Sequence, residues 1–141
     1  MKPNITVLFC DDIRHELGGK VSLMGVYGSH LLVHTLPVQL PKLAVHFNIE
    51  MPTEMKPDSI KVNIVINGKN HTSLELGGIG YNDTLAKEIY GHRITGGTDL
   101  NQIDLPEKTK IEAIVELDGK KAYSSVLIVD TKDNFDAMQA T

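Results

Sequence analysis

The side chains of this 141-residue chain that could do chemistry are densest near its start, in the run from Cys10 to Glu16. This run contains a thiol, carboxylates, a guanidinium and an imidazole. Asp11 and His15 could join a serine as the orienting acid, the base and the nucleophile of a hydrolase. Because the chain has 6 histidines and several serines, such a trio arises easily by chance. We therefore expect no catalytic residues and interpret the protein as a non-enzyme.

Ion pairing is the simpler chemistry for the same run. A structural turn with an ion-pair cluster is the interpretation that we favour, because perturbed charge clusters are often only structural. The cluster would consist of Asp12, Arg14, Glu16 and Lys20. The alternative is a binding site, for which the candidate residues are Asp11, Asp12, Arg14 and Glu16.

Asp11 conflicts with the strand pattern around it. Successive strand side chains point to opposite faces, so the apolar residues of one parity mark the buried face: Ile5, Val7, Phe9 and Ile13. Asp11 shares that parity and should face the core, where a lone carboxylate is costly. Either a β-bulge shifts the register near Asp11, or a partner such as Arg14, His15 or a backbone N–H binds its carboxylate.

The first third of the chain resembles a known family. The resemblance is carried by three segments: Cys10-Asp11-Asp12-Ile13-Arg14-His15-Glu16, Gly19-Lys20-Val21-Ser22-Leu23-Met24-Gly25-Val26-Tyr27 and Leu40-Pro41-Lys42-Leu43. They are similar to the opening of an uncharacterised family of short bacterial and phage proteins. The resemblance implies a bacterial or phage origin, and it implies no activity, because that family has no assigned function.

Composition describes an ordinary globular chain of one domain, with 41% apolar and 23% charged residues. A net charge of −4 and scattered basic residues make nucleic acid a poor candidate partner. The single cysteine, Cys10, can form no internal disulfide, and we expect it to lie in the core as a small hydrophobe. No run has the length or character of a signal peptide or membrane helix, so we expect a cytoplasmic protein, in the host cytoplasm if it is phage-encoded.

Two-residue alternation dominates the rest of the chain. The segments 43–51, 60–66 and 111–117 alternate apolar and polar residues, and Asn67-Gly68 and Asp118-Gly119 favour tight hairpin turns. Eight short strands are expected. The sequence predicts an all-β, single-domain antiparallel β-sandwich over residues 1–130, immunoglobulin-like or a related Greek key, followed by a solvated C-terminal tail over residues 131–141.

The segment 77–108 carries half of the 12 glycines and is predicted to be a long Gly-rich connection. A short helix over Thr84 to His92, capped by Asp83, is one interpretation, with Leu85, Ala86 and Ile89 facing inward. A strand from Lys87 to Thr95 is the other. The glycines around Gly78 lack the Lys-Ser/Thr of a phosphate loop, so an irregular turn is expected there.

Aromatic and charged residues on this connection suit recognition, because such side chains dominate interface energetics. The candidate binding residues are Gly78, Tyr81, Tyr90, His92 and Arg93. Packing of the two tyrosines over the sheet is the alternative. His30 and His34 are too far apart on a strand to share a metal ion, so we expect no metal and no cofactor.

The sequence therefore favours a non-catalytic binding protein that recognises a partner protein, with self-association through exposed strand edges as an additional expectation. One alternative is a protein that sequesters a small molecule or nucleotide in an anion pocket near Arg14, His92 or Arg93. Another is a structural component of a virion.

Overall fold

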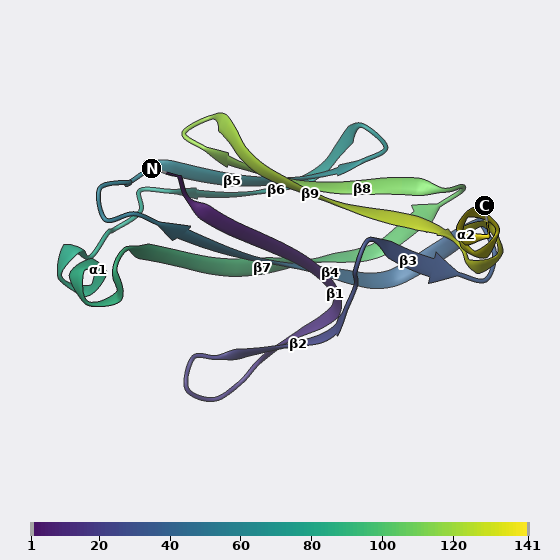
Figure 1. The fold of residues 1–141 in the computed structure, drawn as a ribbon, viewed down its shortest axis with the longest axis horizontal. Helices are drawn as coiled ribbons and strands as arrows, with labels where there is room; N and C mark the ends of the chain where they lie inside the picture. The colour runs from purple at the N-terminus through teal and green to yellow at the C-terminus, as the bar shows by residue number, and fades with distance from the viewer. Residues whose placement is uncertain (1, 141) are drawn as a thin grey trace.

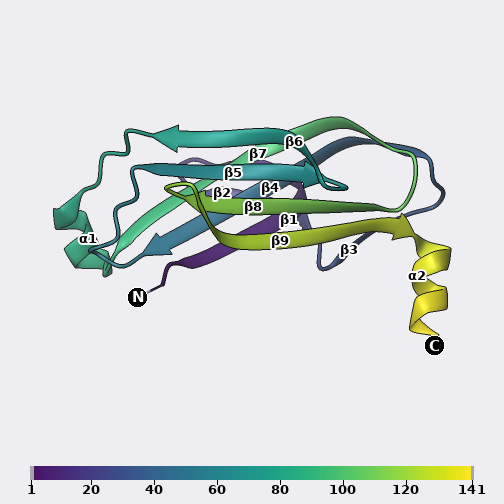
Figure 2. The ribbon, with the colours of Figure 1, turned by 90° about the horizontal axis from the view of Figure 1, so that it is seen from above.

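Two β-sheets packed face to face make up the protein, and two short helices lie at opposite ends of this sandwich (Figures 1 and 2). The structure is a computed structural model that describes residues 2–140. Its elements are β1 (Asn4–His15), β2 (Val21–Val26), β3 (His30–Val33), β4 (Val38–Met51), β5 (Ser59–Ile66), β6 (Lys69–Gly77), α1 (Asp83–Ile89), β7 (His92–Leu105), β8 (Thr109–Leu117), β9 (Lys120–Thr131) and α2 (Lys132–Gln139). Sheet A has the strand order β2-β1-β4-β7, and sheet B has the order β3-β9-β8-β5-β6. The predicted all-β sandwich is confirmed.

The core lies between the two sheets and follows the predicted alternation. Strand β4 buries every second residue of its central part: Leu43, Val45, Phe47 and Ile49. Sheet B faces them with a second buried set: Ile60, Val62, Ile64, Ile111, Ala113, Val115, Leu127 and Val129. Burial of these aliphatic side chains supplies the main driving force for folding.

Both predicted hairpin turns are present. Asn67 and Gly68 have φ of 47° and 82°, and Asp118 and Gly119 have φ of 49° and 79°, as a type I′ turn requires. The asparagine and aspartate side chains also bind neighbouring backbone, because Asn67 Oδ1 accepts from Lys110 N and Asp118 Oδ1 accepts from the backbone N–H of Ser59.

The chain crosses repeatedly between the sheets, as in immunoglobulin-like sandwiches. Strands β4 and β7 are neighbours in sheet A, while β5 and β8 are neighbours in sheet B. One prediction needs correction, because β3 pairs parallel with β9 and the sandwich is not wholly antiparallel. The chain reaches β3 by crossing from sheet A, not through a tight turn, so nothing forces antiparallel pairing. Residues 2–140 also contain nine strands, one more than expected.

The extra strand is β7, which overturns the prediction of a long Gly-rich connection over residues 77–108. Only residues 78–91 connect the sheets there, and the rest is mainly a 14-residue strand paired with β4 along its whole length. Gly96 faces the core, and a Cβ at this position would lie 2.7 Å from Phe47 Cζ. Gly97 faces outward, and its Cβ would lie 2.7 Å from Ile13 Cδ1. The two glycines thus make room for bulky side chains on both faces.

The predicted short helix is present as α1, but it ends at Ile89 and not at His92, and its predicted cap and buried face were also wrong. Asn82 caps the helix instead of Asp83, since Asn82 has extended backbone and its side chain accepts from Leu85 N at 3.0 Å. Only Ala86 is buried, whereas Leu85 and Ile89 are exposed. The helix sits beyond the end of the sandwich, so a single buried residue is enough to attach it.

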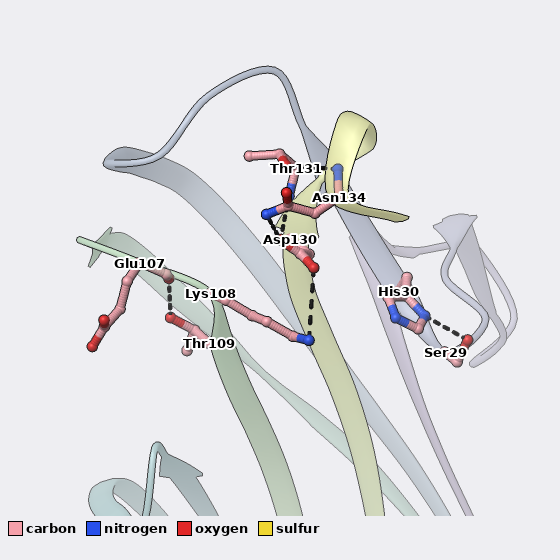
Figure 3. Close-up of polar contacts among 8 residues, drawn as sticks. All are labelled: Ser29, His30, Glu107, Lys108, Thr109, Asp130, Thr131 and Asn134. Carbon is pink, nitrogen blue, oxygen red and sulfur yellow. Dashed lines mark hydrogen bonds and ion pairs between the residues drawn. The ribbon is translucent and has the colours of Figure 1, made fainter. Parts of the chain in front are cut away.

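Residues 132–139, in the predicted solvated tail, form the regular helix α2, which buries none of its side chains. Asp130, whose side chain is 4% exposed, links the helix to β9 (Figure 3). Its carboxylate accepts from Thr131 N at 2.8 Å and from Asn134 Nδ2 at 3.1 Å, with Lys108 Nζ 3.8 Å away. Phe135 packs against the ring of His30, at 4.9 Å between centroids. The Asp130 cluster is therefore a joint between the sandwich and α2.

Replacing Asp130 by asparagine is expected to lower the free energy of unfolding at pH 7 by about 1 to 2 kcal/mol, since charge-assisted hydrogen bonds are lost. The hydrogen bond from Asn134, with help from the Thr131 N–H and Lys108, holds the pKa of Asp130 below its ordinary value. A depressed pKa stabilises the fold at neutral pH, and this stabilisation disappears as the pH falls through the folded-state pKa. Denaturant unfolding from pH 7 down to pH 2 should show the two proteins converging in acid; a constant difference would contradict the assignment.

Candidate functional site

The hairpin formed by β1 and β2 leaves the sandwich halfway along its length. Strand β1 pairs with β4 only as far as Cys10, and residues 12–15 pair only with β2 (Figure 1). Ile13 then lies against Gly97, on the outer face of sheet A. We call residues 11–26 the hairpin flap, because this segment extends over the outer face of sheet A.

Asp11 is exposed and does not face the core, which corrects the parity prediction. Its carboxylate accepts a hydrogen bond from the hydroxyl of Tyr27 and lies over Gly25, where any side chain would overlap it. The β1–β2 register continues unbroken on both sides of Asp11, so no bulge is involved. Burial, together with the hydrogen bond to Asp11, raises the pKa of Tyr27 to about 12. The partner of Asp11 is thus Tyr27, the residue that follows β2, and neither Arg14 nor His15.

Of the expected ion-pair cluster, only the pair of Asp12 and Arg14 is present among the described residues, and Lys42 is the central cation around Asp12. Lys42 Nζ lies 2.5 Å from Asp12 Oδ1 and 3.7 Å from Asp99 Oδ2, while Arg14 Nε is 3.8 Å from Asp12. The hydrogen bond from Lys42 lowers the pKa of Asp12, and the same bond raises the pKa of Lys42. These groups join neighbouring strands β1, β4 and β7 at the base of the flap. Within residues 2–140, Glu16 and Lys20 take no part in it.

Between the flap and sheet A lies a groove of about 890 Å³, which we call the flap groove. Its floor includes His46, Asn48 and Glu50 of β4, with Arg93 and Thr95 of β7 beside them. The flap contributes mainly Ile13, His15, Lys20 and Val21. The volume is within the range of small-molecule sites.

Two polar groups on the floor, Asn48 Oδ1 and the His46 ring, are available to a ligand. Asn48 Nδ2 donates to Glu50 Oε1 at 3.1 Å, but Asn48 Oδ1 is buried and has no hydrogen-bond partner within residues 2–140. His46, predicted to face solvent, is half-buried on the same strand face, where burial lowers its pKa and keeps the imidazole neutral at pH 7. Buried polar atoms are nearly always hydrogen-bonded, so an orphan acceptor in a groove marks a place for a ligand or water.

At the α1 end of the sandwich, two of the predicted binding residues are structural. Tyr81 donates its hydroxyl hydrogen to the carbonyl of Pro57 at 2.6 Å, and its ring meets the His92 ring edge-on at 4.9 Å. His92 is buried, with Nε2 at 3.0 Å from the carbonyl oxygen of Thr53. Burial also raises the pKa of Tyr81. These contacts attach the segment around α1 to the β4–β5 connection. Tyr81 therefore packs against the sandwich, which was the alternative to a role in binding.

Tyr90, unlike Tyr81, is not packed against the sandwich. It is 91% exposed and occupies the left-handed conformation, with φ 63° and ψ 35°, at the C-cap of α1. The exposed side chain of Ile89 and the half-exposed side chain of Arg93 line a shallow pocket together with Tyr90, and Leu85, also exposed, lines the next pocket with Ile89 and Arg93. We call Leu85, Ile89, Tyr90 and Arg93 the helix corner. Arg93 Nε is 3.7 Å from Glu50, and this pair borders both the helix corner and the flap groove.

The candidate residues thus fall into a flap group and a corner group that approach each other at Arg93. Gly78 belongs to neither: it has φ 61° and open space around it, in agreement with a turn. Sequence reasoning missed His46 and Asn48, although their alternation with buried residues in β4 placed them on one face. The flap groove was not predicted, because it depends on the long-range contact of Ile13 with β7.

The described part of the chain, residues 2–140, contains no group of three His, Cys, Asp or Glu side chains placed to hold a metal ion. Cys10 is buried as predicted, and burial raises the pKa of its thiol, which disfavours the reactive thiolate. Neither α1 nor α2 has the length and apolar character needed to cross a bilayer.

Comparison with known families gives a match over residues 5–130 to DUF6941, a family of unknown function. The chain belongs to the DUF6941 family. The match covers the sandwich, the hairpin flap and the helix corner, and it ends at Asp130, so that α2 lies outside it. No curated protein matches the chain. The expected membership of an uncharacterised family is therefore confirmed, and the family assignment brings no activity with it.

Proposed function

We propose that this protein is a non-catalytic binding protein whose helix corner docks onto a partner protein. Tyr90 carries the proposal. A bulky residue in the left-handed region costs of order 1 kcal/mol, and helices usually end at this conformation with glycine. Packing within the protein offsets almost none of this cost, because 91% of Tyr90 faces solvent. Such local cost is typical of residues used for recognition.

The surroundings of Tyr90 have the composition of an interface. Tyrosine and arginine are the residues most enriched at binding hot spots, and exposed aliphatic neighbours help exclude water around them. Leu85 and Ile89 supply the aliphatic part, and Arg93 the charged part. The base beneath them is rigid, because Tyr81 and His92 hold the helix segment to the sandwich.

The hairpin flap offers a second apolar surface to the same partner. Leu17 at its tip is 94% exposed, and Val21, Met24 and Val26 of β2 are also exposed. Strand β2 is at the edge of sheet A. In the described structure, the backbone N–H and C=O groups on its outer side therefore pair with no other strand. Self-association through this edge would use the same surface. From the resemblance of its opening segments, we further propose a bacterial or phage origin.

Replacing Tyr90 by glycine is expected to have opposite effects on stability and binding. The free energy of unfolding should rise by about 0.5 to 1 kcal/mol, because glycine adopts the left-handed conformation without strain. Affinity for the partner should fall by at least about 30-fold, the loss of a hot-spot residue. A photo-crosslinking amino acid at position 90 would first identify the partner, and calorimetry would then measure both quantities.

Gln102→Gly is the matched control. Gln102 is also exposed with positive φ, at 51°, and its side chain has no partner within residues 2–140. This variant should gain similar stability while binding the partner like the unchanged protein. Equal binding by Tyr90→Gly and Gln102→Gly would refute the helix corner as the docking site.

A further inference from the structure

The flap groove has a chemical character of its own, distinct from the apolar helix corner. Its acidic groups are already paired: Glu50 accepts from Asn48 and lies beside Arg93, and Asp99 lies beside Lys42. The cationic side chain of Lys20 and the imidazole of His15, both on the flap side, have no partner within the described residues. The charge in the groove that no ion pair within the described residues balances is therefore positive.

The floor supplies the complementary polar groups. Asn48 Oδ1 is a buried acceptor without a donor, and the hydroxyl of Thr95 stands opposite Asn48 in the β4–β7 register. His46 stands opposite Gly97, and Ile13 of the flap packs over that glycine, so the neutral imidazole lies beside an apolar side chain of the groove lining. An orphan acceptor in a partly buried site selects a ligand with an N–H or O–H group, because leaving it unpaired is costly.

We propose that the flap groove binds a small organic anion that also carries a hydrogen-bond donor, with Lys20 and His15 facing its negative group and Asn48 Oδ1 accepting from its donor. Hydroxycarboxylates, acylated amino acids and nucleoside monophosphates share this chemistry. The inference goes beyond the docking of a partner at the helix corner and does not rest on it. Of the three residues near which an anion pocket was expected, Arg14, His92 and Arg93, this proposal keeps Arg93, which lines the flap groove.

Thermal unfolding of the full chain with a designed set of probes tests this chemistry. Gluconate, N-acetylglycine and adenosine monophosphate carry both an anion and a donor, whereas acetate lacks the donor and glucose lacks the anion. A ligand that binds only the native state raises the melting midpoint by mass action. At least one of the first three probes should raise the midpoint, and acetate and glucose should not. If none of the three binds, the proposal is wrong.

Variants locate the site. Lys20→Gln and Asn48→Ala should each weaken the binding of the active probe by at least about tenfold, the loss of one charged or buried hydrogen bond. Lys69→Gln, on strand β6 of the other sheet, is the matched control and should bind like the unchanged protein. Unaltered binding by both Lys20→Gln and Asn48→Ala would overturn the site.

Two further results separate this site from the helix corner. Tyr90→Gly should bind the probe normally, and Lys20→Gln should bind the partner protein normally. The active probe should also slow tryptic cleavage after Arg14 and Lys20, because a ligand between the flap and sheet A holds the flap closed. Cleavage at an unchanged rate with the probe bound would place the probe elsewhere and contradict the proposal.

Discussion

Replacing Gly96 by alanine is expected to lower the free energy of unfolding by about 2 kcal/mol, within the range for overpacking a well-packed core. The added methyl group would lie 2.7 Å from Cζ of Phe47, a side chain that is only 1% exposed. Its ring has no open space to move into, since interiors are packed as densely as organic crystals. Urea unfolding followed by circular dichroism measures the change.

The sign of this effect is informative, because strand propensity alone predicts the reverse. Gly96 lies in extended strand, where alanine would ordinarily be tolerated or favoured. Gly28→Ala is the control, since Gly28 is exposed with no atom within 4 Å of the added Cβ and no positive φ. Combining Gly96→Ala with Phe47→Leu should cost less than the sum of the two single changes. Strict additivity would show that the two positions do not meet.

Replacing Gly97 by valine is expected to release the hairpin flap. The new side chain would collide with Ile13 Cδ1, 2.7 Å from the added Cβ, and would press on the carbonyl oxygen of Val45 at 2.8 Å. Ile13 is the flap's apolar contact with β7, so it must lift away. Tryptic cleavage after Arg14 and Lys20 should accelerate by about tenfold, equivalent to about 1.4 kcal/mol in the opening equilibrium.

Ile13→Ala provides the independent comparison for this release. It removes this apolar contact without touching the backbone of β4 or β7, so it should accelerate the same cleavages with little change in global stability. Gly97→Val should in addition lose stability through the Val45 contact. If lysines of sheet B such as Lys61 and Lys110 become equally sensitive to trypsin in Ile13→Ala, the flap is not a separately opening unit.

The alternation of apolar residues determined the sandwich from sequence alone. Segments such as 43–51 and 60–66 could be assigned without the structure, because the two-residue period is a property of the strand itself. The turns at Asn67-Gly68 and Asp118-Gly119 were equally readable, since their positive φ is a local requirement. The burial of Cys10 also followed from local pattern, and a short helix before β7 was one of the two interpretations that this pattern allowed.

Only the tertiary structure could identify the full length of β7, of which the alternative strand from Lys87 to Thr95 covered only the start, and the flap groove. Gly96 and Gly97 carry no side chains, so they leave no periodic signal in the sequence. They make room for Phe47 and Ile13, which are distant in sequence. The same limit applies to the candidate residues, because Tyr81 and Tyr90 look alike in the sequence, yet one is tied to Pro57 and the other faces solvent. Local chemistry determines which residues form strands and turns. Which of the remaining polar and aromatic residues are free to bind is decided by the contacts that distant segments make with them.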